Sequence, residues 1–210
     1  MLGTREPPLS RATLVLGLYG ALGLTAILVS AGRGDADIFR IDEERAPWWH
    51  LVSAASGLAF ALAVILASRA AATRLAWART LHRDFRAILG QVSPREIFIL
   101  AAASAIGEEL LFRGALQPWI GVGPQAVLFA MLHVGPERRH LVWTAWALAM
   151  GLALGAMVQA TGDLVGATVA HFAINFVNLR YIVRVDDPMP PWRRAVAAVD
   201  PPVVAVGAEP

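Results

Sequence analysis

The chain lacks cysteine altogether and is poor in charged residues. The absence of cysteine among its 210 residues excludes disulfides, thiolate zinc sites and a cysteine nucleophile. Only 16% of the residues are charged and 57% are hydrophobic, whereas a soluble domain has about 25% charged residues. So little charge cannot cover a water-facing surface, and we predict a multi-pass membrane protein.

Long apolar runs recur along the whole sequence. A transmembrane helix needs about 20 mostly apolar residues, or somewhat fewer where neighbouring helices surround it. The first run is long for a signal peptide and is interpreted as a retained span. Six segments fit, the fourth of them short: Ala12–Ala31, Trp49–Ser68, Glu96–Leu116, Pro124–Val134, Leu141–Ala160 and Leu164–Val183. Between the second and third, residues 69–91 predict an amphipathic cytoplasmic helix or an interfacial elbow.

Lysine is also absent, since all 18 basic residues are arginine, a bias typical of a GC-rich, bacterial genome. With an inner amino terminus, the outer segments hold only Arg33, Arg40 and Arg45, and Arg113 alone lies deep within a span, away from its ends. The positive-inside rule therefore favours six spans with both termini cytoplasmic, and we expect a bacterial inner-membrane protein. The arginines stand at the ends of apolar runs and form no single patch, which argues against a nucleic-acid partner.

These patterns predict an all-α, multi-pass transmembrane helix bundle in three parts. Residues 1–94 hold two spans and the amphipathic segment, residues 95–185 hold a core of four spans, and residues 186–210 form a flexible tail rich in proline, valine and alanine. Among the histidines outside the core spans, His140 is expected to be a solvated loop residue.

The stretch "GEELLFRGAL" at 107–116 places three ionisable groups inside an expected span. Ser93, Pro94 and Glu96 predict a capped helix start, so Glu108 and Glu109 lie roughly 20 Å along the helix. A charge at that depth costs about 2.5–3.5 kcal/mol even on a lenient scale. Glu109 and Arg113 are four residues apart and are predicted to form a structural ion pair. Glu108 then remains unmatched and becomes the candidate for chemistry.

Two later spans carry polar pairs at the same four-residue spacing. "FAMLH" aligns Phe129 with His133, and "HFAIN" aligns His171 with Asn175. If these helices face a common centre, Glu108 and His133 could deprotonate a water molecule, while His171 and Asn175 could stabilise a tetrahedral intermediate. Phe129 is interpreted as a packing residue that shapes the pocket. The pattern indicates a hydrolase without a nucleophilic side chain.

The three blocks "EELLFR", "FAMLH" and "HFAIN" resemble the signature of the CPBP family, the CAAX-protease and bacteriocin-processing (Abi) intramembrane endopeptidases, whose pattern is EExxxR, FxxxH and HxxxN. The resemblance covers about residues 96–183 and implies an all-α membrane bundle. It also implies that Glu108 and His133 activate water and that His171 and Asn175 stabilise the oxyanion. Glu109, Arg113 and Phe129 are supporting residues in this interpretation.

Several alternatives remain open at the level of sequence. Glu108, His133 and His171 could hold zinc, but no HExxH spacing exists, and we favour a mechanism with no metal or other cofactor. The expected partners are the lipid bilayer and a peptide or membrane-protein substrate, and CAAX-prenyl substrates are not expected in a bacterium. A proton-coupled transporter and a non-catalytic bacteriocin-immunity or scaffold protein are the rival functions. The sequence indicates neither the substrate nor the oligomeric state.

Overall fold

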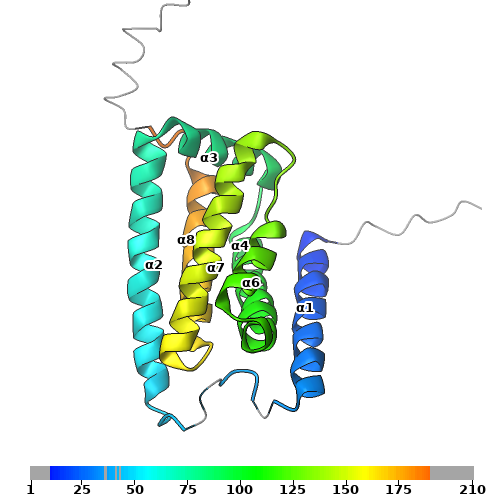
Figure 1. The fold of residues 1–210 in the computed structure, drawn as a ribbon. Coiled ribbons are helices and arrows are strands. Elements are labelled where there is room, and N and C mark those ends of the chain that lie inside the picture. Colours follow the sequence, from blue (N-terminus) through cyan, green and yellow to red (C-terminus); the bar gives the residue numbers. More distant parts are fainter. Residues whose placement is uncertain (1–9, 36, 41, 43, 190–210) are drawn as a thin grey trace, which may run out of the picture.

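The computed structural model describes residues 10–35, 37–40, 42 and 44–189, and these form a helical bundle without an extended strand (Figure 1). This confirms the predicted all-α fold. The predicted flexible tail lies mostly outside the described residues. The elements are α1 Arg11–Arg33, α2 Trp49–Arg74, α3 Ala76–Leu89, α4 Pro94–Glu108, the π-helix η1 Glu109–Leu116, α5 Gln117–Ile120, α6 Val122–Met131, the 3₁₀ turn η2 Arg138–His140, α7 Leu141–Thr161 and α8 Val165–Arg184.

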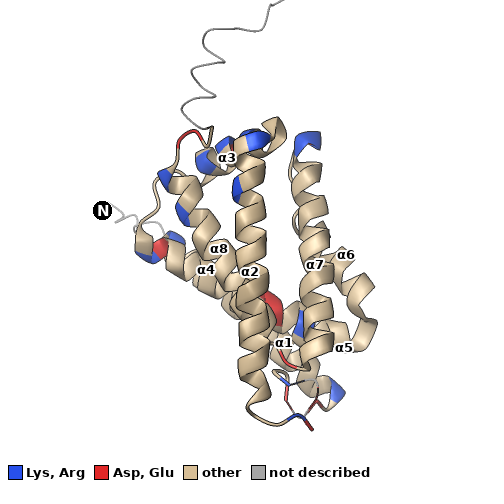
Figure 2. Ribbon diagram, turned by 90° about the vertical axis from the view of Figure 1, so that its left-hand side faces the viewer, with Lys and Arg blue, Asp and Glu red and all other residues tan. Residues whose placement is uncertain are grey.

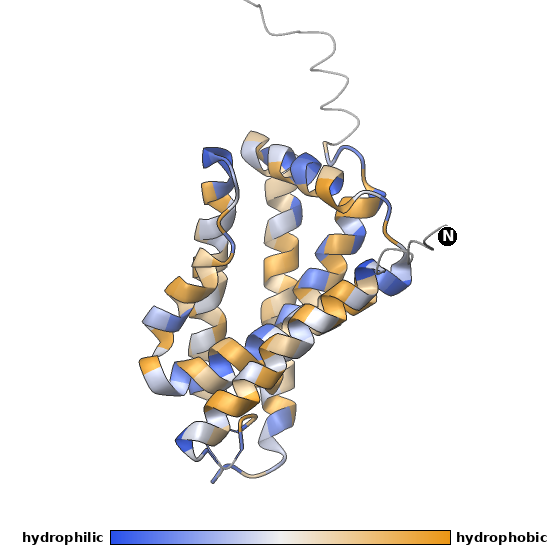
Figure 3. Cartoon of the chain, turned by 90° about the vertical axis from the view of Figure 1, so that its right-hand side faces the viewer, coloured by the Kyte–Doolittle hydropathy of each residue, from blue (hydrophilic) through white to orange (hydrophobic). Residues whose placement is uncertain are grey.

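Within the part of the chain that the structure describes, three helical stretches are long and apolar enough to cross a membrane: α1, α2 and Arg138–Thr161. The apolar surface of α1 is largely open, with Leu14, Leu18 and Leu28 each more than half exposed. Figure 3 shows this helix crossing the face of the bundle with much of its surface apolar. A surface of that kind is suited to lipid acyl chains. The apolar helix α6 has only ten residues, and the six-span arrangement stays a prediction.

The expected third span is divided into two kinds of helix. It begins as predicted, with the Ser93 and Glu96 capping box and Pro94 in the first turn. After Glu108 the backbone widens into the π-helix η1, and at its end the Gln117 N–H bonds to the Phe112 carbonyl, five residues earlier. Arg33 of α1 donates to the Ala115 carbonyl of η1. Such π segments are rare and occur frequently at functional sites.

Helices α2 and α8 cross at a point of backbone contact. A Cβ atom on Gly57 would collide with the Gly166 carbonyl group, so this crossing requires glycine. Ser53 Oγ accepts the Gly166 N–H at 2.8 Å and lies 2.5 Å from Asp163 Oδ1. Asp163 in turn accepts the Val165 N–H at 2.9 Å. These bonds fix the start of α8, the helix that carries His171 and Asn175.

Helix α3 lies across one end of the bundle, over the ends of α7 and α8 (Figure 1). Its Phe85 ring contacts Trp143 at 4.9 Å between centroids, and Arg86 donates to the Ile182 carbonyl at 2.9 Å. Several ribbon segments coloured for arginine lie at this end, as Figure 2 shows. A separate helix, α3, thus lies within the predicted segment 69–91, whose first residues instead continue α2. Its cytoplasmic location stays a prediction.

The expectation for His140 was wrong. This residue is only 7% exposed, and its Nε2 atom lies 3.6 Å from Asp84 Oδ2 of α3. The turn η2 brings His140 under α3, a packing contact between segments far apart in the sequence. The neighbouring Arg138 and Arg139 gave no signal of that burial.

Candidate active site

Glu108 ends α4 inside the bundle and is 8% exposed. Its Oε2 atom lies 3.8 Å from Nε2 of His171 on α8. A separation of 3.8 Å exceeds a normal hydrogen bond, so the two groups are neighbours without a direct bond. The structure therefore brings together the carboxyl group and one of the imidazoles that the sequence singled out.

Glu109 and Arg113 are both completely buried and form the predicted ion pair, with 3.0 Å between Arg113 NH1 and Glu109 Oε1. The same oxygen lies 2.7 Å from Nδ1 of His171. Glu109 therefore contacts the cation of its own helix and an imidazole of α8 through one atom. The second contact was not predicted, and it makes Glu109 an orienting group for His171 as well as an ion-pair partner.

The bond to Glu109 also decides which His171 nitrogen carries a proton in the neutral ring. A carboxylate only accepts hydrogen bonds, so the proton is assigned to Nδ1 and the Nε2 lone pair faces Glu108. A neutral His171 can thus accept a proton at Nε2, and only its protonated form can donate there. An orienting carboxylate behind a histidine is the arrangement that fixes the ring and stabilises its protonated form.

His133 is fixed in the same tautomer by a different acceptor. Its Nδ1 atom lies 2.7 Å from the Phe129 carbonyl oxygen, which can only accept. Nε2 of the neutral ring therefore carries a free lone pair. The His133 ring also packs on the Phe129 ring, with centroids 4.5 Å apart, and against Trp143 at 5.8 Å.

Phe129 is the packing residue that links the two histidines. Its ring is 4.5 Å from that of His133 and 6.4 Å from that of His171. The guanidinium carbon of Arg113 lies 4.6 Å from the Phe129 centroid, a cation–π geometry. With 4% of its surface exposed, Phe129 is a buried packing residue that contacts the Arg113 guanidinium and both imidazole rings.

Asn175 stands one turn after His171 on α8. Its Nδ2 atom donates to Ser104 Oγ at 3.1 Å. Ser104 precedes Glu108 by four residues on α4, so the two share a helix face. The amide is thereby held against the helix that carries the candidate acid. Ser104 was missed by the sequence analysis, although its spacing from Glu108 could have signalled it.

A second layer of polar side chains joins η1, α5 and α6 to the backbone of α7. Arg113, Gln117 and Gln125 donate to the carbonyl oxygens of Gly151 and Gly155 over 3.0–3.4 Å. A Cβ atom on Gly155 would lie 2.7 Å from Gln125 Nε2 and 2.8 Å from Gln117 Oε1. The small-xxx-small spacing of these glycines is typical of close helix packing in membranes. This spacing is visible in the sequence itself.

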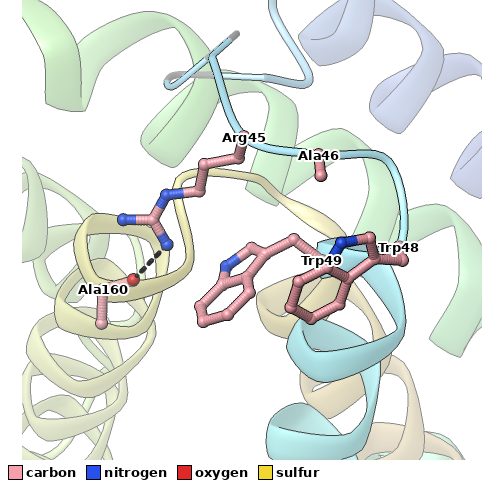
Figure 4. A pocket seen from close by; sticks show the side chains of 5 residues that line it. All are labelled: Arg45, Ala46, Trp48, Trp49 and Ala160. Carbon is pink, nitrogen blue, oxygen red and sulfur yellow. Dashed lines mark hydrogen bonds between the residues drawn. The ribbon is translucent and has the colours of Figure 1, made fainter.

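Other groups do not extend this cluster. Within the described residues, no set of three His, Asp or Glu side chains is placed to hold a metal ion. A pocket of about 350 Å³ lies elsewhere, in the loop before α2, where Arg45, Trp48, Trp49 and Ala160 line it (Figure 4). Arg45 NH1 donates to the Ala160 carbonyl at 2.8 Å there. None of these pocket residues belongs to the Glu108 cluster.

Comparison with known proteins agrees with the three motif blocks. Residues 91–177 match the family model described as "Type II CAAX prenyl endopeptidase Rce1-like". The chain is also 34% identical over 125 residues to the uncharacterized protein YpbD of Bacillus subtilis (strain 168), a match that covers 58% of this chain and 64% of that protein. The chain thus spans less than two thirds of that relative. No solved structure matches it significantly. All the candidate site residues lie within 91–177, the region that is similar to the Rce1-like family, as the resemblance to the CPBP pattern predicted.

Proposed function

We propose that the protein is an intramembrane endopeptidase of the glutamic type. The observation that carries the proposal is the carboxyl group of Glu108, buried in an apolar bundle and 3.8 Å from His171. Intramembrane carboxylates of this kind are functional by default. The family of residues 91–177 supports a protease, and peptides or proteins delivered at the membrane are the proposed substrates.

In the proposed reaction, Glu108 and His133 activate a water molecule. As the water oxygen bonds to the peptide carbonyl carbon, its proton passes to Glu108 or to the free Nε2 of His133. The carbonyl becomes an oxyanion, and the Asn175 amide and a protonated His171 donate hydrogen bonds to it. Collapse of this intermediate breaks the C–N bond. The proton taken from water then passes to the departing amine, so no metal ion is needed to balance the step.

In this reaction, His171 can donate to the oxyanion only when its ring is protonated at both nitrogens. Since its Nδ1–H is held by Glu109, donation to the oxyanion requires a second proton at Nε2. Glu109 is the negatively charged group in contact with that ring. The buried Arg113 already balances part of this charge, and the two cations share one carboxylate.

A substrate search tests the proposal against its rivals. Membrane peptides are compared among cells that make the wild-type protein, cells that make Glu108→Gln, and cells that make neither. We expect a precursor to accumulate in the last two and a cleaved product to appear only with the wild type. The same three samples are assayed for proton flux across the membrane. A flux that depends on Glu108, without any Glu108-dependent product, would favour a transporter instead. Equal peptide profiles and equal flux in all three would favour an immunity or scaffold role.

We also propose six membrane crossings with both termini cytoplasmic, in a bacterial inner membrane. The absence of cysteine allows a direct test by single cysteines. We expect a membrane-impermeant maleimide to label Glu44→Cys from the periplasmic side and Glu137→Cys only after the membrane is permeabilised. Both residues are exposed. Labelling of the two cysteines from the same side would refute this topology.

A further inference from the structure

The first helix contributes a side chain to the Glu108 cluster. Tyr19 of α1 lies against α4, where a Cβ atom on Gly107 would be 3.1 Å from Tyr19 Cβ and 3.2 Å from Tyr19 Cδ1. Glycine at 107 thus allows the tyrosine to lie directly beside the residue that precedes Glu108. The Glu108 carboxyl group lies within the electrostatic surroundings of the Tyr19 side chain.

The position of Tyr19 on α1 is not that of a lipid-facing residue. Tyr19 is half-buried on a helix whose only fully buried residues are Ala26 and Ser30. Tyr19, Gly23, Ala26 and Ser30 follow one another at spacings of four, three and four, so they form one face of the helix. A Cβ atom on Gly23 would lie 3.7 Å from Leu110 of η1. This face is therefore the one that packs on α4 and η1.

The Glu108 carboxylate needs a hydrogen-bond donor, and Tyr19 can supply one. A carboxylate in an apolar bundle needs hydrogen-bond donors to fix its orientation. His171 Nε2 is 3.8 Å from it and offers a proton only when the ring is protonated. The Tyr19 O–H is a hydrogen-bond donor, and one hydrogen bond from it to Glu108 would leave the other carboxylate lone pairs free for water.

We propose that Tyr19 is a positioning residue, which holds the Glu108 carboxylate in the orientation from which it activates water. The proposal rests on the function proposed above. It adds α1, which lies outside the region 91–177 of the family match, to the catalytic unit. Removal of α1 or displacement of Tyr19 should then slow hydrolysis without removing any of the residues named by the motifs.

The test measures steady-state kinetics of the full-length protein in proteoliposomes, with the precursor found in the comparison of membrane peptides. Tyr19→Phe keeps the ring and removes the hydroxyl. We expect kcat to fall about tenfold, the scale of one hydrogen bond to a charged group, with KM within a factor of two of the wild type. The thermal midpoint of unfolding should stay the same, because the ring still packs on Gly107.

The chain supplies a matched control, since it contains only one other tyrosine. Tyr181 stacks on Arg69 at the α3 end of the bundle, and Tyr181→Phe should leave kcat and KM unchanged. The coupling to Glu108 is tested in a Glu108→Asp background, where the shorter carboxylate moves away from the hydroxyl. There the effect of Tyr19→Phe on kcat should shrink to less than threefold.

The outcomes separate this proposal from the one on which it depends. If cleavage requires Glu108 but Tyr19→Phe keeps the wild-type kcat, or acts equally in both backgrounds, Tyr19 has no positioning role and the proposed function stands. A fall in thermal midpoint with an unchanged kcat would show a purely structural tyrosine. If no cleavage depends on Glu108, the proposed function itself fails.

Discussion

Replacing Glu108 with glutamine is expected to lower kcat by at least about a hundredfold, since general acid–base groups contribute about 10²–10⁴-fold. Glutamine has the same shape, but its amide cannot accept a proton from water at neutral pH. Glu108 is 8% exposed and lies beside His171, so bulk water cannot replace the lost base. The measurement is cleavage of the identified precursor by purified protein in proteoliposomes.

A matched control separates the loss of this base from a general effect of removing a negative charge. Glu137 lies in the loop before α7 with an exposed side chain and pairs with Arg139. Glu137→Gln should keep the wild-type kcat. Both variants should unfold within a few degrees of the wild type, because glutamine fills the same volume. A Glu108→Gln variant that cleaves the precursor at the wild-type rate would exclude Glu108 as the base.

The sequence predicted the cluster because its parts follow helical spacing. Glu109 and Arg113 are four residues apart, and they pair over 3.0 Å as expected. Glu108 faces α8 as an acid without its own arginine, near His171. In each case a polar residue in an apolar run must find a partner, and that requirement is visible without coordinates.

What the sequence did not predict depends on contacts between distant segments. Tyr19 reaches Glu108 only because α1 approaches α4 at Gly107, and nothing in the local pattern fixes which helices become neighbours. The π-helix that begins at Glu109 has no composition signal of its own. The second partner of Glu109, His171, lies 62 residues later in the chain. Local periodicity predicts which residues share a helix face, whereas tertiary packing decides which helix faces contact one another.

Glu109 contacts both Arg113 of η1 and His171 of α8. Leaving its buried charge without a cation should therefore strongly lower the stability of the bundle. Arg113→Met fills a similar length but leaves the carboxylate, which is fully buried, without its cation. Breaking a buried pair from one side costs about 3–5 kcal/mol of folding free energy. We expect a correspondingly large fall in the thermal midpoint of unfolding. This midpoint is measured by the fluorescence of the seven tryptophans. Arg139→Met, which removes a half-exposed arginine from its pairs with Asp84 and Glu137, should change stability by less than about 1 kcal/mol.

The double variant Glu109→Gln, Arg113→Met tests whether the unpaired charge causes the loss. With both charges removed, no ionised group remains unbalanced at this position, and most of the stability should return. Cleavage should not return with it, because a neutral amide at 109 stabilises a protonated His171 far less than a carboxylate does. A double variant as unstable as Arg113→Met would contradict the charge argument and would point to lost packing of the guanidinium on Phe129. Recovery of stability without recovery of cleavage would separate the two roles of Glu109, as the partner of Arg113 and as the group that orients His171.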